Sequence, residues 1–382
     1  MLVTVAALVA LGPAGSAHAD TPPAPPGLPL PFPVPIAPVG LTGLPPGPAG
    51  GTTAPTGGNP LSGLQFFVDR QTSSAKLAWR YPALSVIARE PGTARFGSFS
   101  FGANRVPDIR TAVVRYLTRA AFQEPGTVPM LATYRVVDGH CGHWADPPGD
   151  RAAYHDFIEG FAQGIGSTKA VLFLEMDSLI TTPCLSAQGL EIRMNELNDA
   201  INILTADCPR LVIYLDAGAA DALPAPRAAS LLARAGVDKI QGFFLNSTHF
   251  DWTAKEIAYG EQISVLTGGK HFVVNTAENG QGPLIPKNRA KDGNEILCNP
   301  PGRGLGPRPT ANTGYPNVDA FAWISIPGNS GGRCVPGAPP AGAYWPAYAL
   351  MLVHNANFSV GHAPSARPAR RHRTHPRKAR RV

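Results

Sequence analysis

The sequence predicts an α/β fold in which parallel strands close into a barrel. Short apolar strand patterns alternate with longer helical patterns along residues 59–360, an order typical of a parallel sheet with helical crossovers. Six or seven such units in one stretch of chain favour a barrel over an open sheet. Residues 171–174 are Val-Leu-Phe-Leu, and such an apolar run between polar residues indicates a strand buried on both faces.

The predicted strands are short apolar runs bounded by polar or turn-forming residues. They cover Ala83–Arg89, Pro129–Val137, Ala170–Asp177, Arg210–Asp216, Ile240–Asn246, His271–Thr276 and Val318–Ile324. The predicted helices place apolar residues at helical spacing. They cover Pro107–Gln123, Asp150–Gly166, Ser186–Ala206, Pro224–Ala235, Thr253–Leu266 and Ala343–Asn355. Residues 281–316, rich in Pro, Gly and Asn, are too long for a simple connection and indicate a functional loop.

The segment before this domain predicts export. Residues 1–19 combine an apolar run with a small-residue cleavage pattern at Ala17-His18-Ala19, as in a secretory signal peptide. Because no Lys or Arg precedes the apolar run, the sequence leaves open whether Met1 is the natural start. The alternative to a signal peptide is an apolar tail on a cytosolic protein. Residues 20–58 hold mainly Pro, Gly, Ala and Thr and predict a linker that cannot bury a core.

The C-terminal segment, residues 361–382, predicts a basic disordered tail. It holds eight of the 33 basic residues, and the rest of the chain has 25 basic against 26 acidic residues. The formal charge of +7 therefore describes the tail, and it gives no support for nucleic-acid binding by the body. In an exported protein such a tail favours an anionic wall polymer or membrane surface. A solvated tail without a partner is the equal alternative.

Polar residues finish four successive predicted strands, at Asp177, Asp216, Asn246 and Asn275. In a parallel α/β fold the carboxyl ends of the strands meet at one mouth, where ligands bind. Each residue alone is better explained as a helix N-cap. The four together predict a site, and Glu175 and Asp177 at the end of the most apolar strand place a carboxylate at its entrance.

A series of motifs, in order, resembles glycoside hydrolase family 6, the inverting cellulases that comprise endoglucanases and cellobiohydrolases. The motifs are Leu131–Cys141, Leu174–Leu179 (Leu-Glu-Met-Asp-Ser-Leu), Tyr214–Gly218 (Tyr-Leu-Asp-Ala-Gly), Asn246, Asn279-Gly280, Cys298-Asn299, Gly302–Gly306, Pro309–Thr313 and Val318–Trp323. The resemblance covers residues 59–358 and implies a distorted parallel β/α barrel of about seven strands. It also implies a secreted monomer that hydrolyses β-1,4-glucosidic bonds of β-glucan or another cell-wall polysaccharide, without a metal or organic cofactor.

The resemblance assigns roles to individual residues. Asp177 aligns with the family's proton donor, and Tyr134, Asp216 and Asn246 align with residues that bind substrate. The resemblance also implies two disulfides, Cys141–Cys184 and Cys298–Cys334, which leaves Cys208 unpaired.

The sequence departs from the family around the donor. An Asp that helps to keep the donor protonated in the family is replaced by His140, which cannot raise the pKa of a neighbouring acid. Asp138 could compensate from two residues away. Asp146 replaces a Ser that helps to hold the water, and it could supply a new carboxylate.

The departures are larger in the region of the general base. The family's Lys, Glu and candidate base Asp are replaced by Ser325, Asn329 and Gly331, and the Arg of its Arg-Asn-Gly motif is replaced by Glu278. Losing a general base costs roughly 10² to 10⁴ in rate. The resemblance therefore implies a glucanase with weakened or altered activity. The alternatives are a non-catalytic glycan-binding or cell-wall protein on a hydrolase scaffold, and a hydrolase of another glycan that uses Asp138 or Asp146.

Overall fold

The computed structural model of this chain describes residues 58–97, 108–136, 150–283 and 298–358. The predicted signal segment, nearly all of the predicted linker and the basic tail lie outside the described residues, so this division of the chain stays a prediction.

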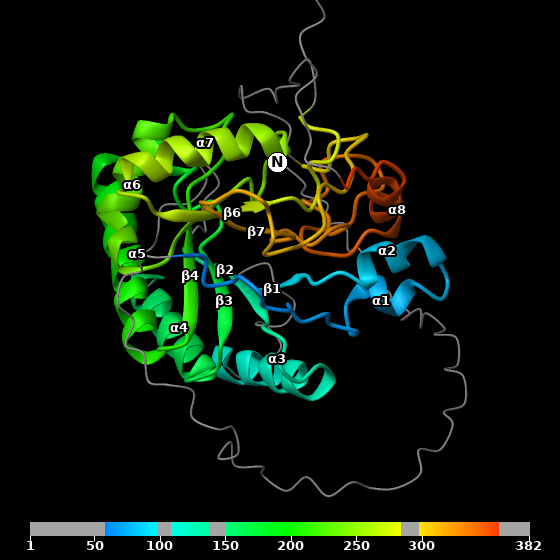
Figure 1. Ribbon diagram of the computed structural model, residues 1–382, viewed down its shortest axis with the longest axis horizontal. Coiled ribbons are helices and arrows are strands. Elements are labelled where there is room, and N and C mark those ends of the chain that lie inside the picture. Colours follow the sequence, from blue (N-terminus) through cyan, green and yellow to red (C-terminus); the bar gives the residue numbers. More distant parts are fainter. Residues whose placement is uncertain (1–57, 98–107, 137–149, 284–297, 359–382) are drawn as a thin grey trace, which may run out of the picture. The chain divides into compact units, whose positions relative to one another are not determined.

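Seven parallel strands form one sheet, and their order in space is their order in the sequence (Figure 1). They are β1 (Thr93–Gly97), β2 (Met130–Tyr134), β3 (Ala170–Leu174), β4 (Leu211–Asp216), β5 (Gly242–Leu245), β6 (His271–Asn275) and β7 (Val318–Ala322). Each strand lies beside its predecessor, so all the crossovers run in one direction around the sheet. The N–H of Thr93 in β1 donates to the carbonyl of Trp323, directly after β7, at 3.3 Å. The two edges therefore approach each other, and the predicted distorted barrel of about seven strands is confirmed.

One predicted strand is wrong. Ala83–Arg89 forms the short helices η1 (Pro82–Leu84) and α2 (Ser85–Ala88), and the first strand follows at Thr93–Gly97. Pro82 supplies a φ suited to a helical first turn, and Leu84 and Ile87, three residues apart, are both buried. The apolar residues of this segment therefore have helical spacing, whereas the true strand carries an arginine in its centre.

Helices connect the strands and surround the sheet. They are α1 (Ser73–Leu77), α3 (Ile109–Gln123), α4 (Asp150–Ile165), α5 (Ala187–Asp207), α6 (Ala225–Ala235), α7 (Thr253–Leu266) and α8 (Pro346–His354), with the short helices η3 (Thr182–Cys184) and η4 (Val237–Lys239). Side-chain caps start three of them: Thr72 accepts from the N–H of Ala75 at 3.2 Å, Asp108 from that of Thr111 at 2.6 Å, and Ser186 from that of Gly189 at 3.0 Å. Within the described ranges, no helix has the length and apolar character needed to cross a membrane.

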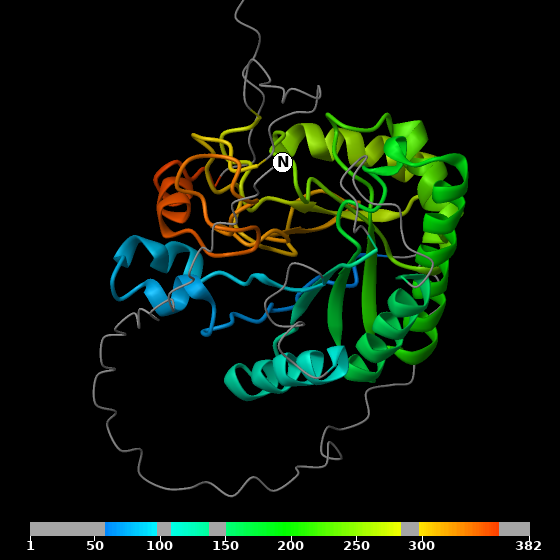
Figure 2. The same cartoon turned by 180° about the vertical axis from the view of Figure 1, so that it is seen from behind.

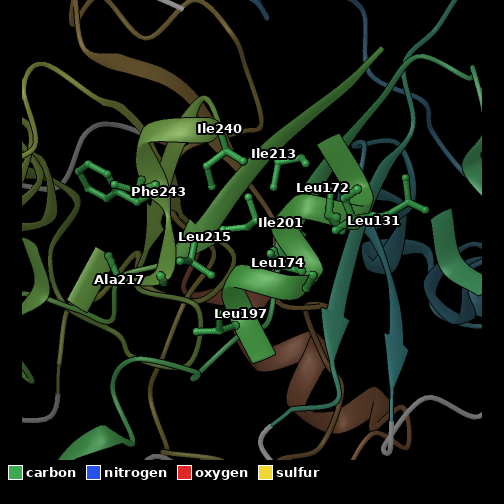
Figure 3. Close-up of a cluster of buried hydrophobic side chains, with 14 of the residues drawn as sticks. Leu131, Leu172, Leu174, Leu197, Ile201, Ile213, Leu215, Ala217, Ile240 and Phe243 are labelled. Atoms are coloured by element: carbon green, nitrogen blue, oxygen red, sulfur yellow. The ribbon is translucent and has the colours of Figure 1, made fainter. Parts of the chain in front are cut away.

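Three apolar clusters hold the domain together. The largest packs the outer face of the sheet against α3 to α7, and Figure 3 shows part of it, including Leu172 and Leu174 of β3 with Leu197 and Ile201 of α5. A second fills the interior of the barrel. The third joins α1, α2 and α8 near Trp323, on the side of the sheet away from the helices α4 to α6 (Figure 2). All of β3 is buried, as its unbroken apolar run predicts.

Candidate active site

The end of β3 turns sharply and separates two carboxylates. Glu175 and Asp177 have φ values of 52° and 65°, in the left-handed region where residues other than glycine are strained. Glu175 is fully buried, and its Oε2 accepts from the N–H groups of Arg135 at 2.7 Å and Val136 at 2.9 Å. Burial raises the pKa of Glu175, although these N–H groups oppose the shift. Glu175 therefore fixes the chain after β2.

Asp177 is partly exposed and lies among polar groups from neighbouring strands. Its Oδ1 accepts from the hydroxyl of Thr248, after β5, at 2.6 Å. The pKa of Tyr134, at the end of β2, is raised by burial and further by the charge of Asp177 and a hydrogen bond to it. The structure therefore brings Tyr134, Asp177 and Thr248 together, as the carboxyl ends of parallel strands should.

Asp216 at the end of β4 belongs to the same group. It is fully buried and accepts from the N–H groups of Leu179 at 3.1 Å and Gly218 at 3.3 Å. Burial, and next the charge of Asp177, raise the pKa of Asp216 to about 7. Two carboxyl groups from adjacent strands therefore influence each other at this mouth.

Asn246 lies at the end of β5, but its side chain is engaged by the backbone. It is fully buried, its Nδ2 donates to the carbonyl of Asn275 at 3.1 Å, and its Oδ1 accepts from the N–H of Asp251 at 3.3 Å. Asn275 in turn donates to the carbonyl of Asn246 at 2.9 Å. These bonds tie the ends of β5 and β6 together, and a role of Asn246 in substrate binding stays a prediction.

The opposite side of the mouth is formed after β6 and β7. Ser325 accepts from Nδ2 of Asn275 at 3.0 Å. A Cβ atom at Gly331 would lie 3.4 Å from the Cα and Sγ atoms of Cys298, so a side chain at this position would start against the disulfide. Glu278, three residues after β6, is the partly buried carboxyl group of this side, and the hydroxyl of Tyr348 lies 3.4 Å from its Oε2.

The remaining predicted site residues give a mixed outcome. Asp138, His140, Cys141 and Asp146 lie outside the described residues. The predicted Cys298–Cys334 disulfide is present and Cys208 is free and buried, so both predictions are confirmed. Cys184 also belongs to a disulfide bond, and the identity of its partner stays a prediction.

Two residues near the mouth escaped the sequence reasoning. Thr248 follows Asn246 by two residues and could have been found by extending the strand-end rule to the loop behind it. Arg95 was missed because the first strand was placed ten residues too early; its true position in β1 pairs it with Ala132 of β2, whose side chain belongs to the barrel interior. Arg95 therefore points into the barrel.

One group of side chains could in principle hold a metal ion. Ligand atoms of Asp221, Asp251 and Glu256 lie within 4.8 Å of one another. Asp221 already contacts His249 at 2.8 Å, and Asp251 contacts Lys255 at 3.3 Å. Both oxygens of Glu256 accept from one backbone N–H. Because these partners occupy the carboxylates, we assign no metal to them.

The fold and site define a parallel β/α barrel with interacting carboxyl groups at the carboxyl ends of its strands. The sequence model described as Glycosyl hydrolases family 6 matches residues 89–356, and the chain belongs to this family.

Two curated relatives and one solved structure illustrate the similarity. Endoglucanase A of Cellulomonas fimi is 33% identical over 305 residues, which are 78% of this chain and 62% of that protein. Endoglucanase 1 of Streptomyces halstedii is 30% identical over 332 residues, 83% of this chain and 95% of that protein. The structure of the endoglucanase Cel6 from Mycobacterium tuberculosis, in complex with methyl-cellobiosyl-4-deoxy-4-thio-β-D-cellobioside, is 35% identical with a TM-score of 0.69, covering 78% of this chain and 99% of that one. The chain spans 62% and 64% of the lengths of the first two curated relatives.

Proposed function

We propose that this protein hydrolyses β-1,4-glucosidic bonds of soluble glucans with inversion at the anomeric carbon, and that Asp177 donates the proton to the leaving oxygen. The observation that carries this proposal is the position of Asp177 on a strained turn after β3, partly exposed and in contact with Thr248 and Tyr134. Strain at a strand end is typical of functional sites. The endoglucanases among its relatives support the same substrate class.

The surroundings of Asp177 suit a proton donor. An inverting hydrolase needs one carboxylic acid at the leaving oxygen and one carboxylate that activates water on the other face of the sugar. Asp216, with a pKa raised to about 7, interacts with Asp177 through its charge, and a neighbouring negative charge favours the protonated form that a donor needs. Tyr134, at the end of β2 and hydrogen-bonded to Asp177, is the aromatic side chain we expect to contact the sugar ring.

We further propose that turnover is slower than in typical endoglucanases of the family. The position of the family's candidate base is Gly331, which has no carboxyl group to activate water. This observation also favours the second candidate function, a glycan-binding or cell-wall protein that uses the hydrolase mouth without cleavage. Under that alternative, oligosaccharide binding persists while hydrolysis is absent.

The test is the release of reducing ends from carboxymethyl cellulose and mixed-linkage glucan by the full chain and by Asp177→Ala. We expect slow turnover that falls by about 10² to 10⁴ in the variant. Asp207→Asn, an exposed carboxylate at the end of α5, is the matched control and should retain activity. Equal rates for wild type and Asp177→Ala would reject hydrolysis, and calorimetric binding of cellotetraose in the same samples would then support the glycan-binding alternative.

The sequence also supports a proposal for cellular location. We infer that residues 1–19 direct export, and that 20–58 and 361–382 flank the barrel domain as linker and basic tail. The relatives are glucanases whose polymeric substrates lie outside the cell. N-terminal sequencing of protein recovered from a secreting host should find residue 20 first; an intact Met1 would reject the signal peptide. A chromatographic mass near 40.1 kDa or just below would support the expected monomer.

A further inference from the structure

Glu278 follows the carboxyl end of β6, at the same edge of the sheet as Asp177 after β3. It follows β6, three residues after Asn275, and it stands where the family has an arginine. Among the replacements around the base region, Ser325, Asn329 and Gly331 each remove a charged side chain, whereas Glu278 introduces a carboxylate. The substitutions therefore move an acidic group from the loop after β7 to the end of β6.

Glu278 is held by the same loop that carries Gly331. The N–H of Gly328 donates to its carboxylate, and the hydroxyl of Tyr348 lies 3.4 Å from Oε2. Gly328 has a φ of 91°, and a Cβ atom there would lie 2.5 Å from the Cβ of Ala349 in α8. Only glycine fits this position, so the loop packs closely on α8 and presents its N–H to Glu278.

Arg95 links Glu278 to the donor side of the mouth. It points into the barrel from β1, and β1 meets β7 where Thr93 donates to the carbonyl of Trp323. Its positive charge acts on Tyr134, Asp177 and Glu278. One interior guanidinium therefore lies within electrostatic reach of both carboxylates, from the position where the two edges of the sheet approach each other.

We propose that Glu278 is the second carboxylate of this site and acts as the general base that activates water. The inference rests on the proposed hydrolase function. It places the base at the end of β6 instead of in the loop after β7. The general base has then moved from the position of Gly331 to Glu278 and has not been lost. The positive charge of Arg95 then favours the ionised form of Glu278 that a base needs.

The reaction balances with these two groups. The Glu278 carboxylate takes one proton from water while the water oxygen forms a bond to the anomeric carbon. The bond between that carbon and the glycosidic oxygen breaks, and Asp177 gives its proton to the leaving oxygen. The products are a free 4-hydroxyl group and an inverted hemiacetal; solvent then returns a proton to Asp177 and removes one from Glu278.

The protonation of Glu278 is consistent with this role. Burial raises its pKa to about 7, and the Gly328 N–H, the Tyr348 hydroxyl and the Arg95 charge each act to lower it. Arg303 also lies within electrostatic reach of Tyr348. As a base Glu278 must be ionised, so the rate should rise with pH toward and through about 7.

The test compares Glu278→Gln with Asp177→Ala on two substrates, a soluble β-1,4-glucan and a dinitrophenyl β-cellobioside, whose leaving group needs no proton. Asp177→Ala should lose its activity on the glucan but keep most of its activity on the aryl glycoside. Glu278→Gln should lose about 10² to 10⁴ in kcat on both, with little change in KM. Sodium azide, an anion that needs no deprotonation, should restore turnover of the aryl glycoside by Glu278→Gln and yield an α-glycosyl azide.

Controls separate the possible failures. Glu159→Gln, an exposed carboxylate on α4, should behave as wild type. Tyr348→Phe removes a bond that favours ionised Glu278, so the rising limb of its pH profile should move to higher pH. If Glu278→Gln does not fold, Glu278→Asp should lower kcat while keeping that limb. A folded Glu278→Gln with near-wild-type rates, or a loss that azide does not relieve, overturns the role of Glu278 alone. A wild type inactive on both substrates overturns the proposed function.

Discussion

The hydroxyl oxygen of Thr248 lies 2.6 Å from Oδ1 of Asp177. This short contact joins the loop after β5 to the turn after β3, across the intervening strand β4. This hydrogen bond fixes the orientation of a side chain on a strained turn. Thr248 is thus a positioning residue for the candidate proton donor.

Replacing Thr248 with Val keeps the shape and removes the hydroxyl. An ordinary hydrogen bond contributes about 0.5–1.5 kcal/mol, so kcat on soluble glucan should fall roughly 2-fold to 10-fold if the whole contribution orients Asp177. Steady-state kinetics of Thr248→Val checks this, with Thr248→Ser retaining most of the rate. A Val variant with wild-type kcat would show that the bond does not position the donor.

Asp216 should make stability depend on pH. Its folded pKa of about 7 exceeds the unfolded value near 3.9, so its protonated form is favoured by folding. The resulting stabilisation is fully present below about pH 4 and is lost as pH rises through about 7, on the order of a few kcal/mol. Asp216→Asn removes this term.

The measurement is urea unfolding at pH 5 and pH 8 for wild type and Asp216→Asn. Wild type should lose stability between these values, and the variant should lose less. Other buried acids, including Glu278 and Glu256, have raised pKa values, so the variant should keep part of the slope. If the free energy of unfolding changes by the same amount between pH 5 and pH 8 in both proteins, the prediction is contradicted.

Asp319 at the start of β7 should support the fold and leave the site unaffected. Its carboxylate is fully buried and accepts from Tyr214 at 2.6 Å and Gln241 at 2.8 Å, and His271 Nδ1 lies 2.7 Å away. Asp319→Asn would turn an NH₂ group toward these donors.

We expect Asp319→Asn to lower the free energy of unfolding by about 2–4 kcal/mol, while kcat per folded molecule is unchanged. Chemical denaturation and kinetics at low temperature measure the two quantities separately. Asp238→Asn, an exposed carboxylate in η4, serves as control. A fall in kcat without a fall in stability would instead assign Asp319 to the site.

The Cys298–Cys334 disulfide closes a 36-residue separation that includes β7 and Gly331. The chain-entropy argument gives about 3–4 kcal/mol for a loop of this size. The double variant Cys298→Ser/Cys334→Ser should lose stability of that order in urea unfolding. Cys208→Ala, at the free cysteine, should lose much less. If the free energy of unfolding of the double variant lies within about 1 kcal/mol of the wild-type value, the other contacts of the loop, and not the disulfide, stabilise it.

Much of the fold could be predicted because its signals are local. The apolar run of β3 and the amphipathic pattern of α6 each require only neighbouring residues to be recognised. The strand at Thr93–Gly97 was missed because its central residue is Arg95, and an arginine facing a barrel interior contradicts the usual strand pattern. Its position depends on β2 and β7, which are distant in sequence.

The sequence by itself determined the strand order, the family and the position of Asp177 at a strand end, because these follow from periodicity and from motifs of consecutive residues. Only the tertiary structure decided that Glu175 turns toward buried backbone N–H groups, and that Asp216 and Thr248 meet Asp177. It also decided that the charge of Arg95, in the edge strand β1, acts on Glu278 after β6. Burial, charge interaction and hydrogen bonding depend on distances between residues far apart in the chain, and curling of the sheet is what sets those distances.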